Sequence, residues 1–267
     1  ASDIAKLRLK LVEQDADGIW SEVVASAFSP VLRKPNRYQN RIKFIEQWIT
    51  SKLIHGNAYV LKERDARRAV SRLYVLDPRR VKALVAPDGE VFYQLSRDDL
   101  SRVNGDGIVV PASEIIHDTM VALHHPLVGV SPIYACGLAA TQGLSIQRNS
   151  AKFFANGSRP GGILTAPGTI TETTATRLKA HWEANYSGDN VGKVAVLGDG
   201  LKYESMVIPP SDAQMIEQLR WSGETVCSCY HVPPYMVGIG PSPTYNNIEA
   251  LNAQYYAQCL QALIESL

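Results

Sequence analysis

Few side chains in this sequence combine the residue types and the spacing that chemistry requires. The strongest candidates for a metal site are the pairs His117-Asp118 and His124-His125. Adjacent residues on an extended chain point to opposite faces, so at most one residue of each pair can face a given ion. We therefore expect no metal site at these positions.

The four cysteines, Cys136, Cys227, Cys229 and Cys259, are the next candidates. Only Cys227 and Cys229 are close in sequence, and thiols two positions apart on a helix point in different directions. His231 lies nearby, but proline follows almost at once and no second pair of ligands is near. We expect all four cysteines to be small buried apolar residues in a reducing cytoplasm.

The glycine pairs at 161–162 and at Gly238 and Gly240 lack the surroundings of a nucleotide site. Neither pair has the Lys-Ser/Thr of a P-loop or the strand and helix that flank a dinucleotide fingerprint. No nucleophile elbow or pair of carboxylates stands out either. The sequence thus predicts a protein that is not an enzyme and that needs no cofactor and no metal.

The residues before about 130 have the hydrophobic pattern of an α+β domain. Apolar residues at helical spacing predict a helix over 38–54, which Gly56-Asn57 ends. Short runs typical of β-strands follow at 58–61, 73–76, 81–85, 91–95, 108–110 and 115–117.

Two long helices are predicted in the middle of the chain. Ser131 as N-cap and Pro132 in the first turn begin one helix, which can run to Asn156-Gly157. The other begins at Ser211-Asp212 and must end before Val232-Pro233-Pro234, because the residue before a proline avoids the helical region.

The segment 160–208 between these helices is predicted to form a small αββ unit. Thr169-x-x-Glu172 has the pattern of a capping box for a helix that carries Leu178 and Trp182. A hairpin of 193–197 and 201–208 would follow.

The last part of the chain holds a loop and one more helix. Residues 238–245 are too rich in Gly and Pro for regular structure, and a helix begins near Asn247. This helix is unfinished at Leu267, so we expect the chain to be a trimmed piece of a longer protein.

Composition narrows the class of protein. The chain is 45% hydrophobic and 20% charged, with a formal net charge of +1, as in ordinary globular proteins. No apolar run reaches the roughly 18 residues that a membrane-spanning helix needs. The first residues lack the apolar core of a signal peptide. We therefore expect neither a secreted nor a membrane protein.

The near-neutral total hides a charge gradient. Residues 33–80 contain thirteen Lys and Arg against four acidic residues, whereas no Lys or Arg follows Arg220. Such a basic block is compatible with a nucleic-acid surface, with a solvated face, or with a contact to acidic parts of neighbouring copies.

A series of short motifs runs in one order along most of the chain. They are Lys34-Pro35-Asn36, His55-Gly56-Asn57-Ala58-Tyr59-Val60, Glu114-Ile115-Ile116-His117, Gly129-Val130-Ser131-Pro132-Ile133, Phe154-Ala155-Asn156-Gly157, Gly161-Gly162-Ile163-Leu164, Tyr186-Ser187-Gly188, Gly192–Leu197, Asp212-x-x-Met215-x-Glu217, Val232–Gly238 and Tyr245–Glu249. This order resembles bacteriophage portal proteins of the siphophage and prophage family typified by phage Hong Kong ninety-seven.

The resemblance implies the portal fold, an α+β architecture with a wing domain of helices and short strands, long stem helices and a small αββ clip insertion. The implied parts are a wing at 1–130, stem helix 1 at 131–159, the clip at 160–208, stem helix 2 at 209–231, a VPP turn and tunnel loop at 232–248, and the start of C-terminal wing or crown helices at 249–267.

The resemblance also implies a structural role without catalysis. Portal proteins form a ring, usually a dodecamer, at one vertex of the virion capsid, and are made in the cytoplasm of the bacterial host. Double-stranded DNA passes through the ring during packaging and exit, without sequence readout. The implied partners are other copies of the chain, the large subunit of terminase, head-completion or adaptor proteins, and capsid or scaffold protein; no membrane is involved.

Site residues follow from the same resemblance. The clip residues expected to contact terminase or adaptors are Trp182, Tyr186, Lys193 and Lys202. The tunnel-loop residues expected at the DNA channel are Gly238, Gly240, Thr244, Tyr245 and Asn246. The motif positions of the stem are Ser131, Pro132, Asn156, Gly157, Asp212, Pro233 and Pro234.

Arg148 and Lys152 are the remaining channel candidates, because they form a basic pair four residues apart on the first long helix. One interpretation is weak, salt-screened contact with passing phosphates. The other is ion pairing with Glu217 or Glu224 of the next copy. At the level of the whole protein, the alternatives to a portal are a basic DNA-binding accessory module that uses residues 33–80 and a hydrolase whose site is not visible in the sequence.

Overall fold

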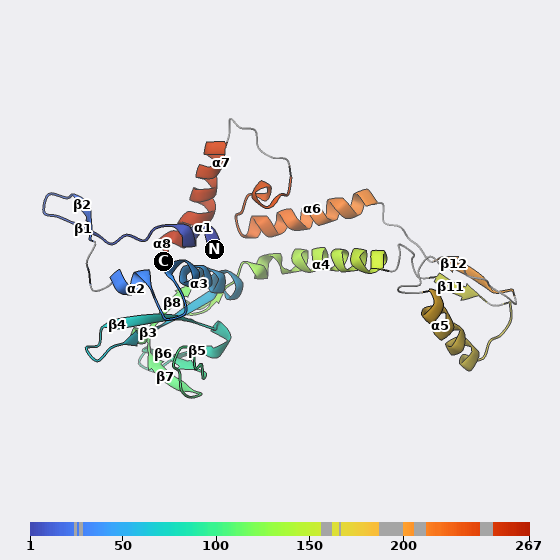
Figure 1. Ribbon diagram of the computed structural model, residues 1–267, viewed down its shortest axis with the longest axis horizontal. Coiled ribbons are helices and arrows are strands. Elements are labelled where there is room, and N and C mark those ends of the chain that lie inside the picture. The colour runs from blue at the N-terminus through green and yellow to red at the C-terminus, as the bar shows by residue number, and fades with distance from the viewer. Residues whose placement is uncertain are drawn as a thin grey trace. The chain divides into compact units, whose positions relative to one another are not determined.

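The computed structural model describes residues 1–23, 26, 29–155, 162–165, 167–186, 200–205, 212–240 and 248–267. The chain divides into two compact units. The first comprises 1–136, 228–233 and 242–267, and the second comprises 137–227 and 234–241. The architecture is a mixture of helices and sheets, as the sequence predicted (Figure 1).

The first unit contains most of the strands. Its helices are α1 (Ser2–Lys6), α2 (Ser29–Arg33), α3 (Arg41–His55), α7 (Ile248–Tyr255) and α8 (Gln261–Glu265), with short 3-10 turns at Pro78–Arg80 and Ala112–Glu114. Its strands are β1 (Val12–Gln14), β2 (Trp20–Glu22), β3 (Asn57–Arg64), β4 (Val70–Leu76), β5 (Val81–Val85), β6 (Val91–Leu95), β7 (Ile108–Pro111), β8 (Ile115–Thr119), β9 (Val121–Ala122) and β10 (Gly129–Val130). The six strands predicted between 58 and 117 are confirmed as β3 to β8, whereas β1, β2, β9 and β10 were not predicted.

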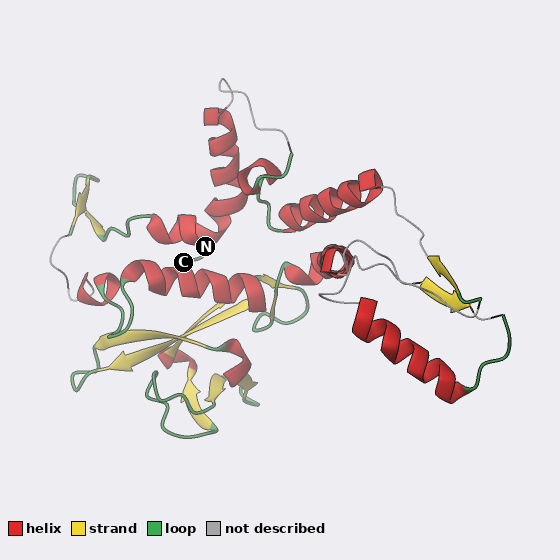
Figure 2. Ribbon diagram, turned by 45° about the vertical axis from the view of Figure 1, so that its right-hand side comes forward, coloured by secondary structure: helices red, strands yellow, loops and turns green. Residues whose placement is uncertain are grey.

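Two antiparallel three-stranded sheets form the centre of this unit, with strand orders β4-β3-β8 and β5-β6-β7. Successive residues of β3 point to opposite sides of their sheet. Ala58 and Val60 pack against α3, while Tyr59 packs with Tyr93 and Leu95 of β6. Figure 2 shows α3 lying across the first sheet.

Helix α3 has an apolar face and both capping signals. The Asn40 side chain accepts a hydrogen bond from the Lys43 backbone N–H at 2.9 Å, which satisfies a free donor of the first turn. Gly56 ends the helix with a left-handed φ of 75°. The sequence-based helix over 38–54 is thus confirmed, although it begins at Arg41.

A buried ion pair joins α3 to the edge strand β8 and to the last helix. Lys52 Nζ lies 2.6 Å from Asp118 Oδ1 and donates to Ser266 Oγ at 2.7 Å. The Trp48 indole donates to the other carboxylate oxygen at 2.9 Å. Both charges are almost fully buried and hydrogen-bonded, which meets the condition for burying an ion pair in a core.

The C-terminal segment packs on the same core. Leu260 and Leu263 lie in one buried cluster with Ile4 and Ile49. Burial, reinforced by a hydrogen bond to Asp3, raises the pKa of Tyr255 to about 12. The sequence predicted one continuous helix here, but a π-helical turn at Tyr256–Leu260 separates α7 from α8 and changes which residues face the core.

A backbone junction holds the start of the first long helix against β3. A Cβ added to Gly129 would lie 2.0 Å from the carbonyl oxygen of Gly56, so only glycine allows the two backbones to approach this closely. Asn57 bonds both peptide groups of Gly129, accepting from its N–H at 3.0 Å and donating to its C=O at 3.1 Å. The Ser131 hydroxyl donates to the Leu53 carbonyl at 2.6 Å.

His117 extends this junction to the second sheet. Its Nε2 lies 3.1 Å from Asn57 Oδ1 and its Nδ1 lies 3.0 Å from the Tyr93 hydroxyl. Because Asn57 Oδ1 can only accept, Nε2 carries a proton and donates to it, and in the neutral ring Nδ1 accepts from the Tyr93 hydroxyl. Tyr59 stacks on the ring at 4.3 Å. Burial lowers the pKa of His117, and the neighbouring Asp118 opposes this shift.

The second unit holds most of two long helices, α4 (Ile133–Ala155) and α6 (Asp212–Cys229), and a 3-10 turn at Pro234–Val237. Ser150 Oγ lies 3.4 Å from Met215 Sδ, and a Cβ added to Gly143 would lie 2.9 Å from Ser222 Oγ. The two contacts are seven residues apart on both helices, so α4 and α6 run antiparallel in register at a seam of small residues. The two predicted helices are confirmed over their described length.

The remaining elements are α5 (Glu172–Tyr186), β11 (Gly162–Thr165) and β12 (Lys202–Ser205). The Thr169 capping box was wrong, because α5 begins at Glu172 and the Thr171 hydroxyl accepts from the Thr174 N–H at 3.4 Å. β12 pairs antiparallel with β11, a strand that was not predicted. The first strand of the predicted 193–208 hairpin lies outside the described residues.

From the backbone junction we predict that alanine substitutions at two glycines have opposite effects on the free energy of unfolding. Gly129→Ala would drive a methyl group into the Gly56 carbonyl, and we expect a loss of about 3 kcal/mol or more in the free energy of unfolding. Gly137→Ala on α4 meets nothing within 4 Å and should gain up to about 1 kcal/mol. Urea unfolding of both variants measures this, and equal midpoints would contradict the junction.

His117 predicts a pH dependence of stability. Its folded pKa lies below the unfolded value, so the unfolded state takes up a proton first as the pH falls. The stability due to the neutral ring is therefore complete above about pH 6.5 and decreases as the pH falls from there towards the folded pKa. Unfolding midpoints between pH 7.5 and 5 should show this slope, which His117→Gln should flatten. The exposed His124→Gln serves as control and should retain the slope.

Candidate functional site

The histidines do not form a metal site. Both ring nitrogens of His117 are occupied by Tyr93 and Asn57, and His125 Nδ1 accepts from the Leu127 backbone N–H at 3.1 Å. Among the residues that the structure describes, no group of three or more His, Cys, Asp or Glu side chains could hold a metal ion.

The four cysteines are free thiols. Cys136 and Cys227 are buried as expected, whereas Cys229 and Cys259 are only partly buried. Burial raises the pKa of Cys136, with the adjacent Cys229 adding to the shift, and burial likewise raises the pKa of Cys227. A raised pKa leaves less thiolate at neutral pH, so neither thiol has the character of a nucleophile.

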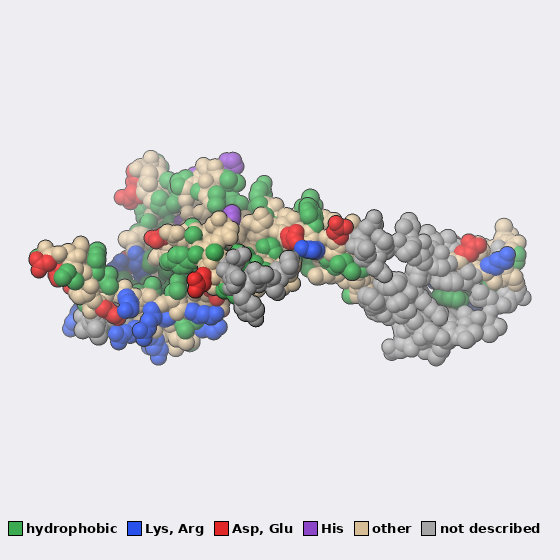
Figure 3. Space-filling model, turned by 90° about the horizontal axis from the view of Figure 1, so that it is seen from above, with side chains coloured by type: hydrophobic (Ala, Val, Ile, Leu, Met, Phe, Trp, Pro, Cys, Tyr) green, Lys and Arg blue, Asp and Glu red, His purple; other side chains and the backbone are tan. Residues whose placement is uncertain are grey.

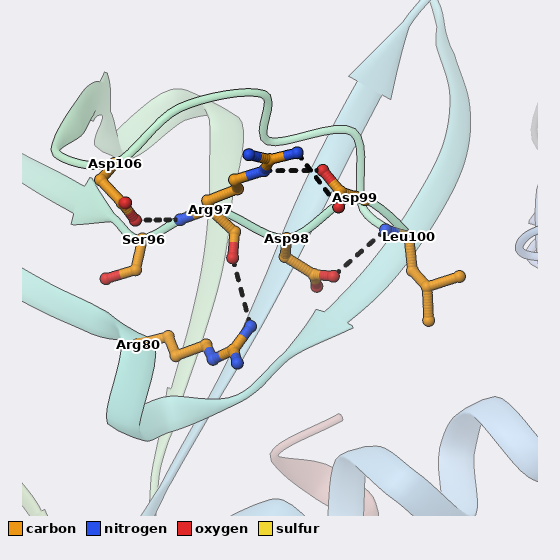
Figure 4. Close-up of a pocket in the computed structure, with 7 residues that line it drawn as sticks. All are labelled: Arg80, Ser96, Arg97, Asp98, Asp99, Leu100 and Asp106. Atoms are coloured by element: carbon orange, nitrogen blue, oxygen red, sulfur yellow. Dashed lines mark hydrogen bonds and ion pairs between the residues drawn. The ribbon is translucent and has the colours of Figure 1, made fainter.

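An acidic depression lies between the ends of β5 and β6 and the loop that leads to β7 (Figure 4). Its carboxylates are engaged within the loop. Asp106 accepts from the Arg97 backbone N–H at 2.8 Å, and Asp99 pairs with the Arg97 guanidinium at 3.0 Å. Asp98 accepts from the Ser101 hydroxyl at 2.6 Å. The carboxylates stabilise a turn, and the depression has no arrangement of a base facing a nucleophile.

The basic block at 33–80 is partly neutralised by local ion pairs. Arg64 pairs with Glu114 at 2.9 Å and Arg72 with Glu63 at 2.9 Å. Other cations of the block, such as Lys34 and Arg67, are exposed and form no ion pair within the described part of the chain. Figure 3 shows Lys and Arg side chains gathered on one side of the molecule.

Arg148 and Lys152 both lie on α4 with exposed side chains. Neither has an ion-pair partner among the described residues. Of the two acidic residues on α6 considered as partners, Glu224 already pairs with Arg220 of its own helix at 2.9 Å. Glu217 is exposed.

The long helices also carry the motif positions Ser131 and Asp212. The Ser131 hydroxyl accepts from the Ile133 N–H at 3.1 Å, which confirms it as an N-cap, with Pro132 following. Asp212 is the first residue of α6. Pro233 and Pro234 follow the helix, and Pro234 begins a 3-10 turn. Asn156 and Gly157 lie outside the described residues.

The expected clip and tunnel residues are described in part. Trp182 and Leu178 are half-buried on α5, and Lys202 is exposed at the start of β12. Gly238 and Gly240 have φ values of 80° and 89°, which favour glycine. Lys193, Thr244, Tyr245, Asn246 and the side chain of Tyr186 lie outside the described residues.

Several apolar side chains on the long helices are exposed in the single chain. Leu144 on α4 is 52% exposed and Ile216 on α6 is 65% exposed. Leu138 and Trp221 are exposed as well. No helix in the described part of the chain has the length and apolar composition to cross a bilayer.

Comparison with known proteins gives the family. The model of the family described as phage portal protein matches residues 1–267. A probable portal protein of Streptomyces phage phiC31 is 29% identical over 212 residues, which are 76% of this chain and 45% of that protein. The chain thus spans less than half of the length of this relative.

Two solved structures share the fold. The crystal structure of an HK97 family phage portal protein from Corynebacterium diphtheriae superimposes with a TM-score of 0.66 at 14% identity, over 97% of this chain and 78% of that one. A chain from the neck of a native GTA particle, computed with C12 symmetry, gives a TM-score of 0.62 at 24% identity, over 89% of this chain and 67% of that one. With the family model matched from the first residue to the last, the chain belongs to the phage portal protein family.

Proposed function

We propose that this chain is the body of a portal subunit, a structural element that forms a ring-shaped channel at one vertex of a capsid. Membership of the portal family and the shared fold support this proposal. The related chain in a particle neck of C12 symmetry supports a dodecamer in the virion. Nothing in the comparisons favours a DNA-binding accessory module.

The observation that carries the proposal is the exposed apolar surface of the second unit. Leu138 on α4 is 86% exposed, and Trp221 on α6 is 56% exposed. Large exposed apolar residues on two packed helices are typical of surfaces that other protein copies cover. A ring of copies would bury these residues between adjacent subunits, because each subunit presents one side of its helices to the next.

The proposed parts follow the order of the chain. Residues 1–130 form the wing, 131–159 and 209–231 the stem helices, 160–208 the clip, 232–248 the turn and tunnel loop, and 249–267 the start of C-terminal wing or crown helices. The clip residues Trp182, Tyr186, Lys193 and Lys202 are proposed to contact terminase or adaptor proteins. Gly238, Gly240, Thr244, Tyr245 and Asn246 are proposed to line the channel.

The proposed channel passes double-stranded DNA without reading its sequence. Phosphate contacts carry no sequence information, and strong adhesion would stop movement. Arg148 and Lys152 are therefore proposed as weak phosphate contacts on the stem. Glu224 pairs with Arg220 of its own helix, which leaves Glu217 as the acidic residue of α6 for the alternative of pairing between copies. The protein performs no catalysis, and the partners are terminase large subunit, head-completion proteins, and capsid or scaffold protein.

Assembly of the intact protein tests the ring. Negative-stain images should show annular particles with a central hole. Leu138→Lys should reduce ring yield more than tenfold, because it places a charge in the contact between subunits. Gln147→Lys, on the opposite side of the same helix, should leave the yield unchanged. Monomers in the parent protein, or equal yields in the two variants, would contradict the proposal.

Lys152→Ala separates the two roles of the basic pair. The channel role predicts normal ring yield with an altered rate of DNA packaging or altered DNA retention, and a larger effect at low salt. Pairing between copies predicts fewer rings instead. Lys82→Ala on β5 is a matched removal of an exposed lysine outside the stem and the clip, and it should change neither quantity. If Lys152→Ala gives a normal ring yield and normal DNA packaging and retention, both the channel role and the pairing role are excluded.

A further inference from the structure

The N-terminal hairpin of β1 and β2 has no buried side. Val12 pairs with Glu22, Glu13 with Ser21, and Gln14 with Trp20, and all six residues are exposed. The turn is well formed, since Asp15 Oδ1 accepts from the backbone N–H groups of Asp17 and Ile19. An isolated two-stranded hairpin is marginally stable in water, so a hairpin of defined register needs a surface to pack on.

One face of the hairpin has an apolar centre. Cross-strand partners share a face, so Val12, Gln14, Trp20 and Glu22 point to the same side. Trp20 is 63% exposed in the single chain, as is Ile19 at the end of the turn. A tryptophan can bury roughly 150–250 Å² and interacts well with a guanidinium over its ring. This face therefore suits a surface that combines arginine with apolar contacts.

The hairpin is also purely acidic. Between Leu11 and Val23 the sequence has Glu13, Asp15, Asp17 and Glu22 and no Lys or Arg. Glu22 pairs with Lys10 at 3.0 Å, and Asp15 is used in the turn. Glu13 and Asp17 have no cationic partner in the described part of the chain.

A surface of opposite charge lies along β4. We call it the basic edge and define it as Arg33, Lys34, Arg37, Arg67 and Arg68, all exposed and without an ion-pair partner among the described residues. The segment after α2 is held on β4, because the Leu73 N–H donates to the Pro35 carbonyl at 2.8 Å and the Asn36 amide donates to the Leu73 carbonyl at 3.0 Å.

Both parts of the basic edge adjoin β4, one through Leu73 and the other through the turn before Val70. Arg67 and Arg68 belong to the turn that leads into this strand, and Tyr38, which follows the edge, is 66% exposed. The basic edge thus offers guanidinium groups and an exposed aromatic ring. Trp20 can interact with both, through its ring face and through apolar contact.

We propose that the acidic hairpin of one copy docks on the basic edge of the next copy. The inference rests on the proposed ring. A closed ring needs two different complementary surfaces on every subunit, and the hairpin and the basic edge form such a pair. In the single chain both strands of the hairpin remain exposed. In this proposal the basic block of 33–80 contacts the acidic hairpin of a neighbouring copy.

Charge reversal in the intact protein tests the contact. The pair Asp17→Lys in the turn and Glu22→Lys on the Trp20 face should raise the protein concentration needed for half-assembly at least tenfold, measured by mass photometry, with the larger effect at low salt. Adding Arg67→Glu and Arg68→Glu should restore most of the assembly, because the charges are exchanged. Glu90→Lys, an exposed reversal in the β5–β6 turn, should assemble like the parent. Equal assembly of the hairpin variant and the parent, or no rescue by the exchange, would overturn the inference.

Crosslinking identifies the copy that is contacted. A photoreactive phenylalanine replaces Trp20 in isotopically heavy protein, which is mixed with light protein before assembly. Heavy–light crosslinks to 29–37 or 64–72 are expected. Rings in which Trp20 crosslinks only within its own copy, to other segments or to another protein overturn the inference and leave the proposed function standing. A parent protein that forms no ring overturns both.

Discussion

The close approach of two backbones, at Gly56 and Gly129, is the constraint on which the first unit depends. Gly56 ends α3 and precedes β3, while Gly129 lies in β10 just before α4. One contact therefore sets the exit of a core helix, the start of the central strand and the start of a long helix. A side chain at either position would separate the backbones, since the added Cβ would lie within 2.3 Å of a carbonyl oxygen. The Asn57 side chain then holds the position with hydrogen bonds to both peptide groups of Gly129.

Buried polar groups around this junction connect segments that are distant in sequence. Lys52 and Asp118 join α3, β8 and the C-terminal helix, and His117 joins the two sheets. Such groups add little net stability compared with apolar side chains of the same shape, but leaving one of them unpaired is costly. They therefore favour one arrangement of the helices and sheets over others. In a subunit that must match its neighbours, a uniquely defined arrangement has a direct use.

The proposed assembly gives the exposed apolar and charged surfaces a common physical origin. A single chain leaves Leu138 and Trp221 on its long helices and Trp20 on its hairpin in contact with water. It also separates acidic and basic residues along the sequence. Both features are unfavourable or neutral for an isolated subunit, and both become favourable when copies meet, because apolar area is buried and opposite charges approach.

The sequence by itself determined the helices and strands with strong periodicity or clear caps, and the family. The Ser131 cap of α4 and the Gly56 end of α3 are local signals and were predicted, whereas the Asn40 cap of α3 was missed because the helix was expected from residue 38. The hairpin of β1 and β2 was missed although Asp17-Gly18 is a turn signal, because its strands are short and have no buried face. Only the tertiary structure decided which residues the π-helical turn directs to the core, which carboxylate neutralises Lys52, and which apolar stripes stay exposed. These outcomes depend on contacts between residues far apart in the chain, and periodicity within one segment carries no information about them.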